Sequence, residues 1–110
     1  MRVYCVEAFV VDEPRTEDDG DMHIVLRDPA APRSSLISEF PTSNCAAVCV
    51  SPWVGAMAEA RKRMEGALKT MGDTLRIIVV GVGLFDRPHN QTGAAPNYIE
   101  LHPVLAVRFP

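Results

Sequence analysis

The chain has 110 residues, 47% of them hydrophobic, and a formal net charge of -3. This length is that of one domain with a single modest core, so we expect residues 1–110 to form one domain. No apolar run approaches the ~20 residues that a helix needs to span a bilayer. The first residues also lack the apolar stretch and cleavage site of an export signal. We therefore expect no membrane association, and a protein that is either cytoplasmic or exported with its signal already removed.

The charge pattern argues against a nucleic-acid partner. Acidic residues outnumber basic ones, and the largest basic cluster is Arg61–Arg63, which is too small to follow a phosphate backbone. Most of the aromatic residues fall within apolar strand patterns, where we expect their side chains to be buried in the core. They are Tyr4, Phe9, Phe40, Trp53, Phe85, Tyr98 and Phe109. Few rings then remain on which exposed bases can stack.

Three cysteines leave at least one thiol unpaired, so the chain is not a disulfide scaffold. Cys45 and Cys49 lie four positions apart without a second pair, which is weak evidence for zinc. Two interpretations stay open. Cys45 and Cys49 are either small buried side chains in an apolar stretch, or one of them forms a bridge to Cys5.

The first half of the chain reads as three strands. Val, Phe and Tyr are frequent in Arg2–Val11, which predicts a strand, and the charged segment 12–20 suits an exposed hairpin loop. Met22–Leu26 alternates, with Met22, Ile24 and Leu26 expected inward and His23 and Val25 on the opposite face. A turn over 29–34 then leads to a short third strand, Leu36–Phe40, ended by Pro41.

A helix is predicted from Pro52 to Met71, where the apolar period changes from two to three or four. Ser51 is the expected N-cap and Gly72 the expected left-handed C-cap. The apolar stripe of this helix is Met57, Ala60, Met64, Ala67 or Leu68, and Met71. The opposite, solvated face is expected to carry Arg61, Lys62, Arg63 and Glu65.

Two further strands follow the helix. Leu75–Phe85 is almost continuously Ile and Val, and Gly81 and Gly83 within it indicate a bend or bulge. After a loop over 86–97, Tyr98–Phe109 forms the last strand, interrupted at Pro103.

This order of elements predicts a mainly β fold, namely an OB-like five-stranded antiparallel barrel with one helix between strands 3 and 4. The same order also permits an open antiparallel sheet crossed by one helix.

Polar side chains crowd into the last part of the chain. Six of them fall between positions 86 and 102, namely Asp86, His89, Gln91, Asn97, Glu100 and His102. Glu100 and His102 are two apart on a strand and so leave the same face, and Asp21 and His23 repeat this spacing on the second strand. These eight residues are the candidate binding site.

Carboxylates beside imidazoles are the minimum for a metal site or for general acid–base chemistry near neutral pH. The alternative is structural, with the same groups holding the loop to itself and to the barrel by hydrogen bonds. Because the chain has only three histidines and no recognised ligand spacing, we expect no bound metal and no cofactor.

Several stretches of the chain are distinctive, namely Gly81–Asp86, the His-x-Gln-Thr-Gly run at His89–Gly93, Ala95–Asn97 and Ile99–Leu105, together with Asp18–Leu26 and Ile37–Pro41. In these stretches the chain resembles a family of small uncharacterised bacterial OB-fold-like domains. Leu84 stands where typical members have Phe, and Asn90 where they have Gly. The resemblance implies a defined domain type and no particular reaction.

Asp19, Gly20 and Asp21 also resemble the start of the metal site in staphylococcal-nuclease-type barrels. The arginine that those enzymes place on the third strand is absent from Leu36–Phe40.

We therefore expect a non-catalytic module that binds a small molecule or a protein through the face carrying His23, His89, Glu100 and His102. The alternative is a metal-dependent, nuclease-like hydrolase that uses the same cluster. Convergence of imidazoles and a carboxylate on one open point would favour the hydrolase.

Overall fold

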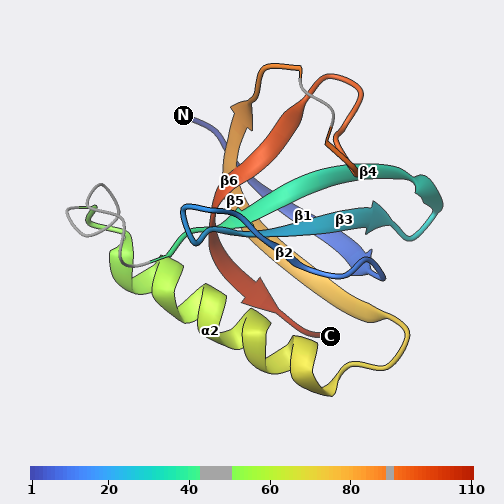
Figure 1. Cartoon of the computed structure of the whole chain (residues 1–110), viewed down its shortest axis with the longest axis horizontal. Helices are drawn as coiled ribbons and strands as arrows, with labels where there is room; N and C mark the ends of the chain where they lie inside the picture. Colours follow the sequence, from blue (N-terminus) through green and yellow to red (C-terminus); the bar gives the residue numbers. More distant parts are fainter. Residues whose placement is uncertain (43–50, 89–90) are drawn as a thin grey trace.

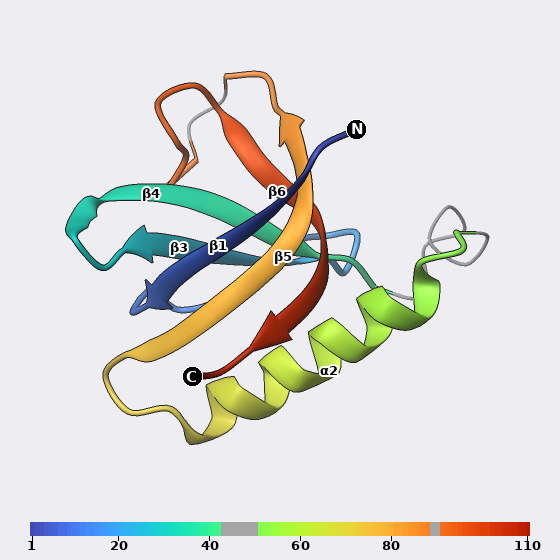
Figure 2. The same ribbon diagram turned by 180° about the vertical axis from the view of Figure 1, so that it is seen from behind.

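The computed structural model describes residues 1–42, 51–88 and 91–110. In chain order its elements are β1 (Val3–Val10), β2 (Arg15–Thr16), β3 (Met22–Asp28), β4 (Ala31–Phe40), α2 (Val54–Thr70), β5 (Leu75–Phe85) and β6 (Ile99–Arg108). Figures 1 and 2 show the strands wrapped around a common interior, with α2 lying across one end.

Five of the strands close into a barrel. The sheet runs β1-β5-β6-β4-β3-β2, and β1 also pairs with β3, where Phe9 lies opposite Arg27. This second pairing joins the two sides of the sheet, so the alternative of an open sheet is wrong. The predicted mainly β barrel with one helix is confirmed.

Two finer expectations about the barrel are wrong. β4 and β6 run parallel, with Ile37 beside Glu100, whereas we expected only antiparallel pairs. A closed ring with an odd number of strands cannot alternate direction all the way round, so at least one neighbouring pair must be parallel. The helix also lies between β4 and β5 and not between strands 3 and 4, because the segment expected to be a loop contains the short strand β2.

The strand boundaries agree best where the alternation is clear. β1 matches the expected Arg2–Val11 to within one residue at each end, and Met22, Ile24 and Leu26 of β3 point inward as expected. β4 begins at Ala31, so the expected turn over 29–34 is too long. The hairpin turns tightly because the Asp28 carboxylate accepts the backbone N–H of Ala30 at 2.8 Å.

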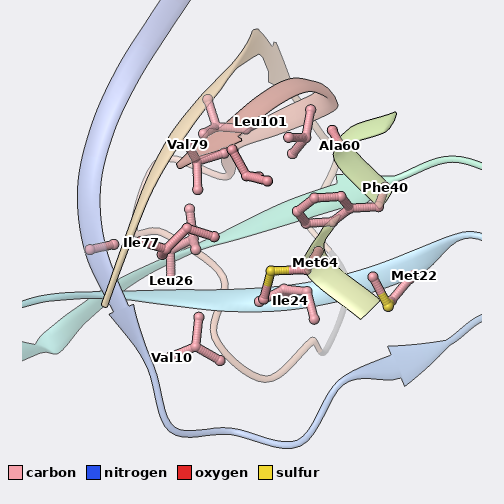
Figure 3. Packing of buried hydrophobic residues seen from close by; sticks show 13 residues of the cluster. Val10, Met22, Ile24, Leu26, Phe40, Ala60, Met64, Ile77, Val79 and Leu101 are labelled. Carbon is pink, nitrogen blue, oxygen red and sulfur yellow. The ribbon is translucent and has the colours of Figure 1, made fainter. Parts of the chain in front are cut away.

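The core fills the barrel and is completed by α2 (Figure 3). Strands β1, β3 and β5 contribute alternate apolar side chains, and Ala60 and Met64 of the helix pack against them. Phe40 is fully buried, but Tyr4, Trp53 and Phe85 are exposed. The expectation that most aromatic side chains are buried in the core is therefore wrong for these three.

Helix α2 buries the expected stripe of Met57, Ala60 and Met64, but its ends differ from the prediction. Trp53 occupies the N-cap position, while the Ser51 hydroxyl accepts the backbone N–H of Trp53 at 3.1 Å. Gly72 is not left-handed, because Met71 ends the helix in an extended conformation. None of the helices in the described ranges is long and apolar enough to cross a membrane.

Gly81 and Gly83 mark a bulge in the β5–β6 hairpin, as predicted. The pairing register shifts at both glycines. A Cβ atom on Gly81 would lie 3.0 Å from Cβ of Leu101, so a larger residue would push the two strands slightly apart. The bulge lies opposite Pro103, which has no backbone N–H to donate to the hydrogen bonds between β5 and β6.

Cys5 is exposed and its thiol is free. The interpretation that Cys5 forms a bridge to Cys45 or Cys49 is therefore wrong. Cys45 and Cys49 themselves lie outside the described residues, and so does the interpretation that their side chains are buried.

Candidate functional site

Three polar side chains form a row across neighbouring strands on the outer face of the barrel. His23 on β3 lies directly opposite Glu39 on β4. The parallel β4–β6 register pairs Ser38 with Leu101, and the next position along each strand brings Glu39 beside His102. Residues opposite one another on adjacent strands share a face and lie in contact.

Glu39 is the centre of this row. Its Oε2 atom lies 3.2 Å from Nε2 of His23 and 3.0 Å from Nδ1 of His102. Only 5% of Glu39 is exposed, and a carboxylate this deeply buried is tolerated because both imidazoles donate hydrogen bonds to it.

Asp21 joins the row from the loop before β3. Gly20, with φ of +90°, lets the chain turn so that the Asp19 carboxylate accepts the backbone N–H of Asp21 at 2.9 Å. The backbone N–H of Thr42 donates to Oδ1 of Asp21 at 3.0 Å. These contacts place the Asp21 carboxyl against that of Glu39, with which it shares a hydrogen bond.

One ligand atom from each of Asp21, Glu39 and His102 lies within 4.8 Å of the others. Carboxylate oxygen and imidazole nitrogen are both common ligands of divalent metal ions. These three residues are therefore the described residues best placed to hold a metal ion.

The row opens into a cleft of about 730 Å³. Its walls come from the loop between β1 and β3, from the three strands of the row and from the loop between β5 and β6; the lining residues are Arg15, Glu17, Asp18, Asp19, His23, Glu39, Gln91 and His102. Four of these side chains are carboxylates, and the Arg15 guanidinium pairs with Glu17 at 2.8 Å. Even with His23 and His102 protonated, the carboxylates outnumber the cationic side chains by one, so the cleft keeps a small excess of negative charge.

Hydrogen bonds set the protonation states at the centre of the row. Burial by itself raises the pKa of Glu39, but hydrogen bonds from His102, His23 and Asp21 outweigh it and hold that pKa far below its usual range. The same hydrogen bonds with Glu39 raise the pKa of His23 and of His102 above the usual value for histidine. Ionised Glu39 and protonated imidazoles thus stabilise one another.

The two flanking carboxyls shift in the opposite direction to Glu39. Burial, followed by the hydrogen bond shared with Glu39, raises the pKa of Asp21 to about 6. Burial, followed by the negative charges of Asp86 and Glu39, raises the pKa of Glu100. Asp21 can therefore exchange a proton near neutral pH, which is a property of acid–base groups and of metal ligands alike.

The structure brings together five of the eight residues predicted for the site. Asp21, His23 and His102 surround Glu39, Glu100 lies 3.9 Å from His102, and Gln91 lies 3.1 Å from Nδ1 of His23.

The other three predicted residues are not shown at the cleft. The Asp86 carboxylate accepts the backbone N–H of Arg87, and its negative charge also acts on Glu100. The Asn97 amide oxygen accepts the backbone N–H of Ile99. His89 lies outside the described residues.

Sequence reasoning missed Glu39, the centre of the row. Its one local signal is a charged residue within the otherwise apolar segment Leu36–Phe40. Arg61 was also misplaced. It was expected on the solvated helix face, but its guanidinium donates to the carbonyl oxygens of Gly20 at 2.7 Å and Phe40 at 3.0 Å.

The β5–β6 loop also makes structural contacts beside the site. The Ser35 hydroxyl donates to the carbonyl of Gly93 at 2.9 Å, and the Gln91 amide contacts Nδ1 of His23, to which it can donate when His23 is neutral. The loop folds back beside β4 (Figure 1). Gln91 thus both fastens the loop and lines the cleft.

Comparison of the chain with protein-family models, with curated proteins and with solved structures finds no match.

Proposed function

We propose that this protein is an OB-like binding module that holds a small positively charged ligand in the acidic cleft. The observation that carries the proposal is the position of the cleft. OB barrels bind through the face of their second and third strands and through the loops that join strands one to two and four to five. Here β3 and β4 supply His23 and Glu39, and the corresponding loops supply Asp18, Asp19 and Gln91.

The sign of the ligand charge follows from the lining residues. Glu17, Asp18, Asp19 and Glu39 face the cleft, and Arg15 already pairs with Glu17. A concave surface with excess negative charge attracts cations and repels phosphates. This supports a cationic ligand and argues against nucleic acid, as does the overall charge of the chain.

The experiment is a titration with hexaamminecobalt(III), followed by backbone amide NMR shifts at low ionic strength. This cation keeps its ammonia ligands, so it binds by charge and hydrogen bonding alone. We expect saturable shifts at residues lining the cleft.

A matched pair of variants tests the location. Asp18→Asn removes one charge from the cleft, while Asp73→Asn removes the same charge after α2, at an exposed position. We expect the first to weaken binding roughly two- to fivefold and the second to leave it nearly unchanged. Shifts in the cleft with inorganic phosphate, and none with the cation, would contradict the proposal.

A second candidate is a metal-dependent hydrolase, favoured by the clustering of Asp21, Glu39 and His102 within 4.8 Å. Its test is cleavage of bis(p-nitrophenyl) phosphate by protein supplied with Mn²⁺ or Zn²⁺. The binding proposal predicts no cleavage above that of an Asp21→Asn variant. Turnover that this substitution abolishes would favour the hydrolase.

A further inference from the structure

We propose that the cation held in the cleft is a divalent transition-metal ion, bound directly by Asp21, Glu39 and His102. This inference rests on the proposed function, because it names the ligand class of the same cleft. It goes further in requiring direct coordination and in naming the three ligands.

The distances between the side chains suit an ion. Nδ1 of His102 and Oε2 of Glu39 are 3.0 Å apart, and all three ligand atoms lie within 4.8 Å of one another. With metal–ligand bonds of about 2.1 Å, adjacent ligands of an octahedral ion are about 3.0 Å apart and those of a tetrahedral ion about 3.4 Å. Small side-chain adjustments therefore suffice to place an ion among them.

The backbone and neighbouring side chains hold these ligands in place. Asp21 is fixed by the Thr42 N–H at 3.0 Å, and Glu39 by Nε2 of His23 at 3.2 Å. The ligands come from three separate segments that the barrel holds together. Partners that orient ligating groups in this way reduce the entropy lost on metal binding.

The charge balance also favours an ion. Asp21 and Glu39 are 9% and 5% exposed and their carboxyls adjoin each other. Among the described residues, the cationic groups within ion-pairing distance of Glu39 are the imidazoles of His23 and His102. A divalent ion would replace the proton at Nδ1 of His102 and neutralise both carboxylates, while His23 would keep its hydrogen bond to Glu39.

The site leaves coordination positions open. Glu39 and His102 line the cleft of about 730 Å³, so water or a small ligand can complete the coordination of an ion bound to three protein groups. Closed structural zinc sites instead use four protein ligands.

The ligand types point to Zn²⁺ or a similar first-row ion. Imidazole disfavours Ca²⁺ and Mg²⁺, which take oxygen ligands, while the two carboxylates disfavour Cu(I). We therefore expect Zn²⁺ and Co²⁺ to bind more tightly than Ca²⁺.

The experiment uses the whole chain after chelation and removal of the chelator. Zn²⁺ is titrated by calorimetry and thermal unfolding near pH ~7.5, and Co²⁺ by its visible absorption. We expect one equivalent of Zn²⁺ to bind, the melting temperature to rise and protons to be released. Co²⁺ is expected to develop the visible bands of a site with nitrogen and oxygen ligands, and Ca²⁺ to have little effect.

Variants locate the site. Asp21→Asn keeps a side-chain oxygen for the Thr42 N–H but loses the charge, and we expect at least a ~10-fold weaker affinity for Zn²⁺. His102→Ala is expected to remove the Co²⁺ bands. Asp18→Asn, in the same cleft but outside the ligand set, is expected to retain the Co²⁺ bands and to weaken the affinity for Zn²⁺ by no more than roughly two- to fivefold. Circular dichroism establishes that each variant is folded.

Two results would overturn the inference. One is a folded protein that neither gains stability with Zn²⁺ nor develops Co²⁺ bands. The other is binding that survives unchanged in both Asp21→Asn and His102→Ala. If hexaamminecobalt(III) binds and Zn²⁺ does not, direct coordination is rejected while the proposed cation-binding function stands; if neither binds, both are rejected.

Discussion

At the scale of single residues, Glu39 determines the charge state of its neighbours. One oxygen of its carboxylate accepts from both His23 and His102, at 3.2 and 3.0 Å. A buried carboxylate between two imidazoles stabilises their protonated forms, because the alternative is an unpaired negative charge in a poorly solvated place. The properties of both histidines therefore depend on this residue.

Replacing Glu39→Gln tests this dependence. The amide oxygen can still accept a hydrogen bond but carries no charge, so we expect the pKa of His23 and of His102 to fall toward the usual histidine value. The measurement is an NMR pH titration of the imidazole C–H signals in metal-free protein.

The control for that prediction is Glu17→Gln. Glu17 lies 3.2 Å from Nδ1 of His23 but is 36% exposed at its side chain, and it makes no ion pair with His102 among the described residues. We expect a smaller fall at His23 and none at His102. An unchanged pKa of His102 in Glu39→Gln would show that another group controls its protonation.

The glycine at position 93 gives a second prediction at this scale. Gly93 has φ of +88°, and a Cβ there would lie 2.5 Å from Cγ2 of Val25. We expect Gly93→Ala to lower the free energy of unfolding by about 1–3 kcal/mol, and to disturb the contact of Gln91 with His23.

Gly66→Ala is the matched substitution. Gly66 is an exposed helical residue, and nothing lies within 4 Å of an added Cβ. Alanine is the better helix former, so we expect a gain in stability of about 0.5–1 kcal/mol. Urea unfolding of the two variants measures both effects, and a neutral Gly93→Ala would contradict the close packing of the loop on β3.

At the scale of elements, α2 supports the site as well as the core. Arg61 reaches from the helix to the carbonyls of Gly20 and Phe40. These two residues directly adjoin Asp21 and Glu39 in the chain. The helix therefore ties together the two segments that carry the carboxyl pair.

Arg61→Met keeps most of the length of the side chain but leaves both carbonyls without this donor. We expect a loss of about 1–3 kcal/mol in the free energy of unfolding. Arg63→Met is the control, because Arg63 is exposed on the same helix, and we expect a change within about 0.5 kcal/mol. Equal effects of the two substitutions in urea unfolding would show that the contact of Arg61 with the barrel contributes nothing measurable.

At the scale of the whole molecule, the order of the strands in the barrel creates the site. The ring has five strands, so one neighbouring pair is parallel, and that pair is β4 and β6. Together with the antiparallel β3–β4 pair it places His23, Glu39 and His102 in one row. An open sheet that left β4 and β6 unpaired would not bring Glu39 to His102.

The net effect of the cluster on the whole fold is a stability that depends on pH. The raised pKa values of His23 and His102 contribute stability that is fully present below the usual value of 6.5 and is lost as pH rises through the folded-state values. The lowered pKa of Glu39 contributes stability above the usual value of 4.5, which is lost as pH falls. The raised pKa of Asp21, about 6, stabilises the fold while this carboxyl is protonated. That contribution to the free energy of unfolding is lost as the pH rises and Asp21 ionises.

We therefore expect metal-free protein to be most stable at about pH 4.5, to lose part of that stability as Asp21 ionises toward about pH 6, and to be less stable still at about pH 8. Urea unfolding across this range measures the profile. Glu39→Gln is expected to flatten the alkaline side, since the histidines lose their partner. A stability that rises steadily from pH ~5.5 to 8 would contradict the assigned directions.

The sequence by itself determined what depends on near neighbours in the chain. Alternation in Met22–Leu26 predicts which side chains point inward, and the spacing of Met57, Ala60 and Met64 predicts the buried face of α2; both are confirmed. The bulge at Gly81 and Gly83 was also predictable. In each case the periodicity of a single element carries the information.

Only the tertiary structure decided which polar residues meet. Asn97 lies close to His102 in the chain, yet its amide oxygen bonds its own loop segment, while Glu39 comes from a distant strand and occupies the centre of the row. The partners of Glu39 depend on the β3–β4 register and on the parallel β4–β6 pair. Both follow from burying one face of each strand within a closed ring, which is a property of the packed molecule and not of any one segment.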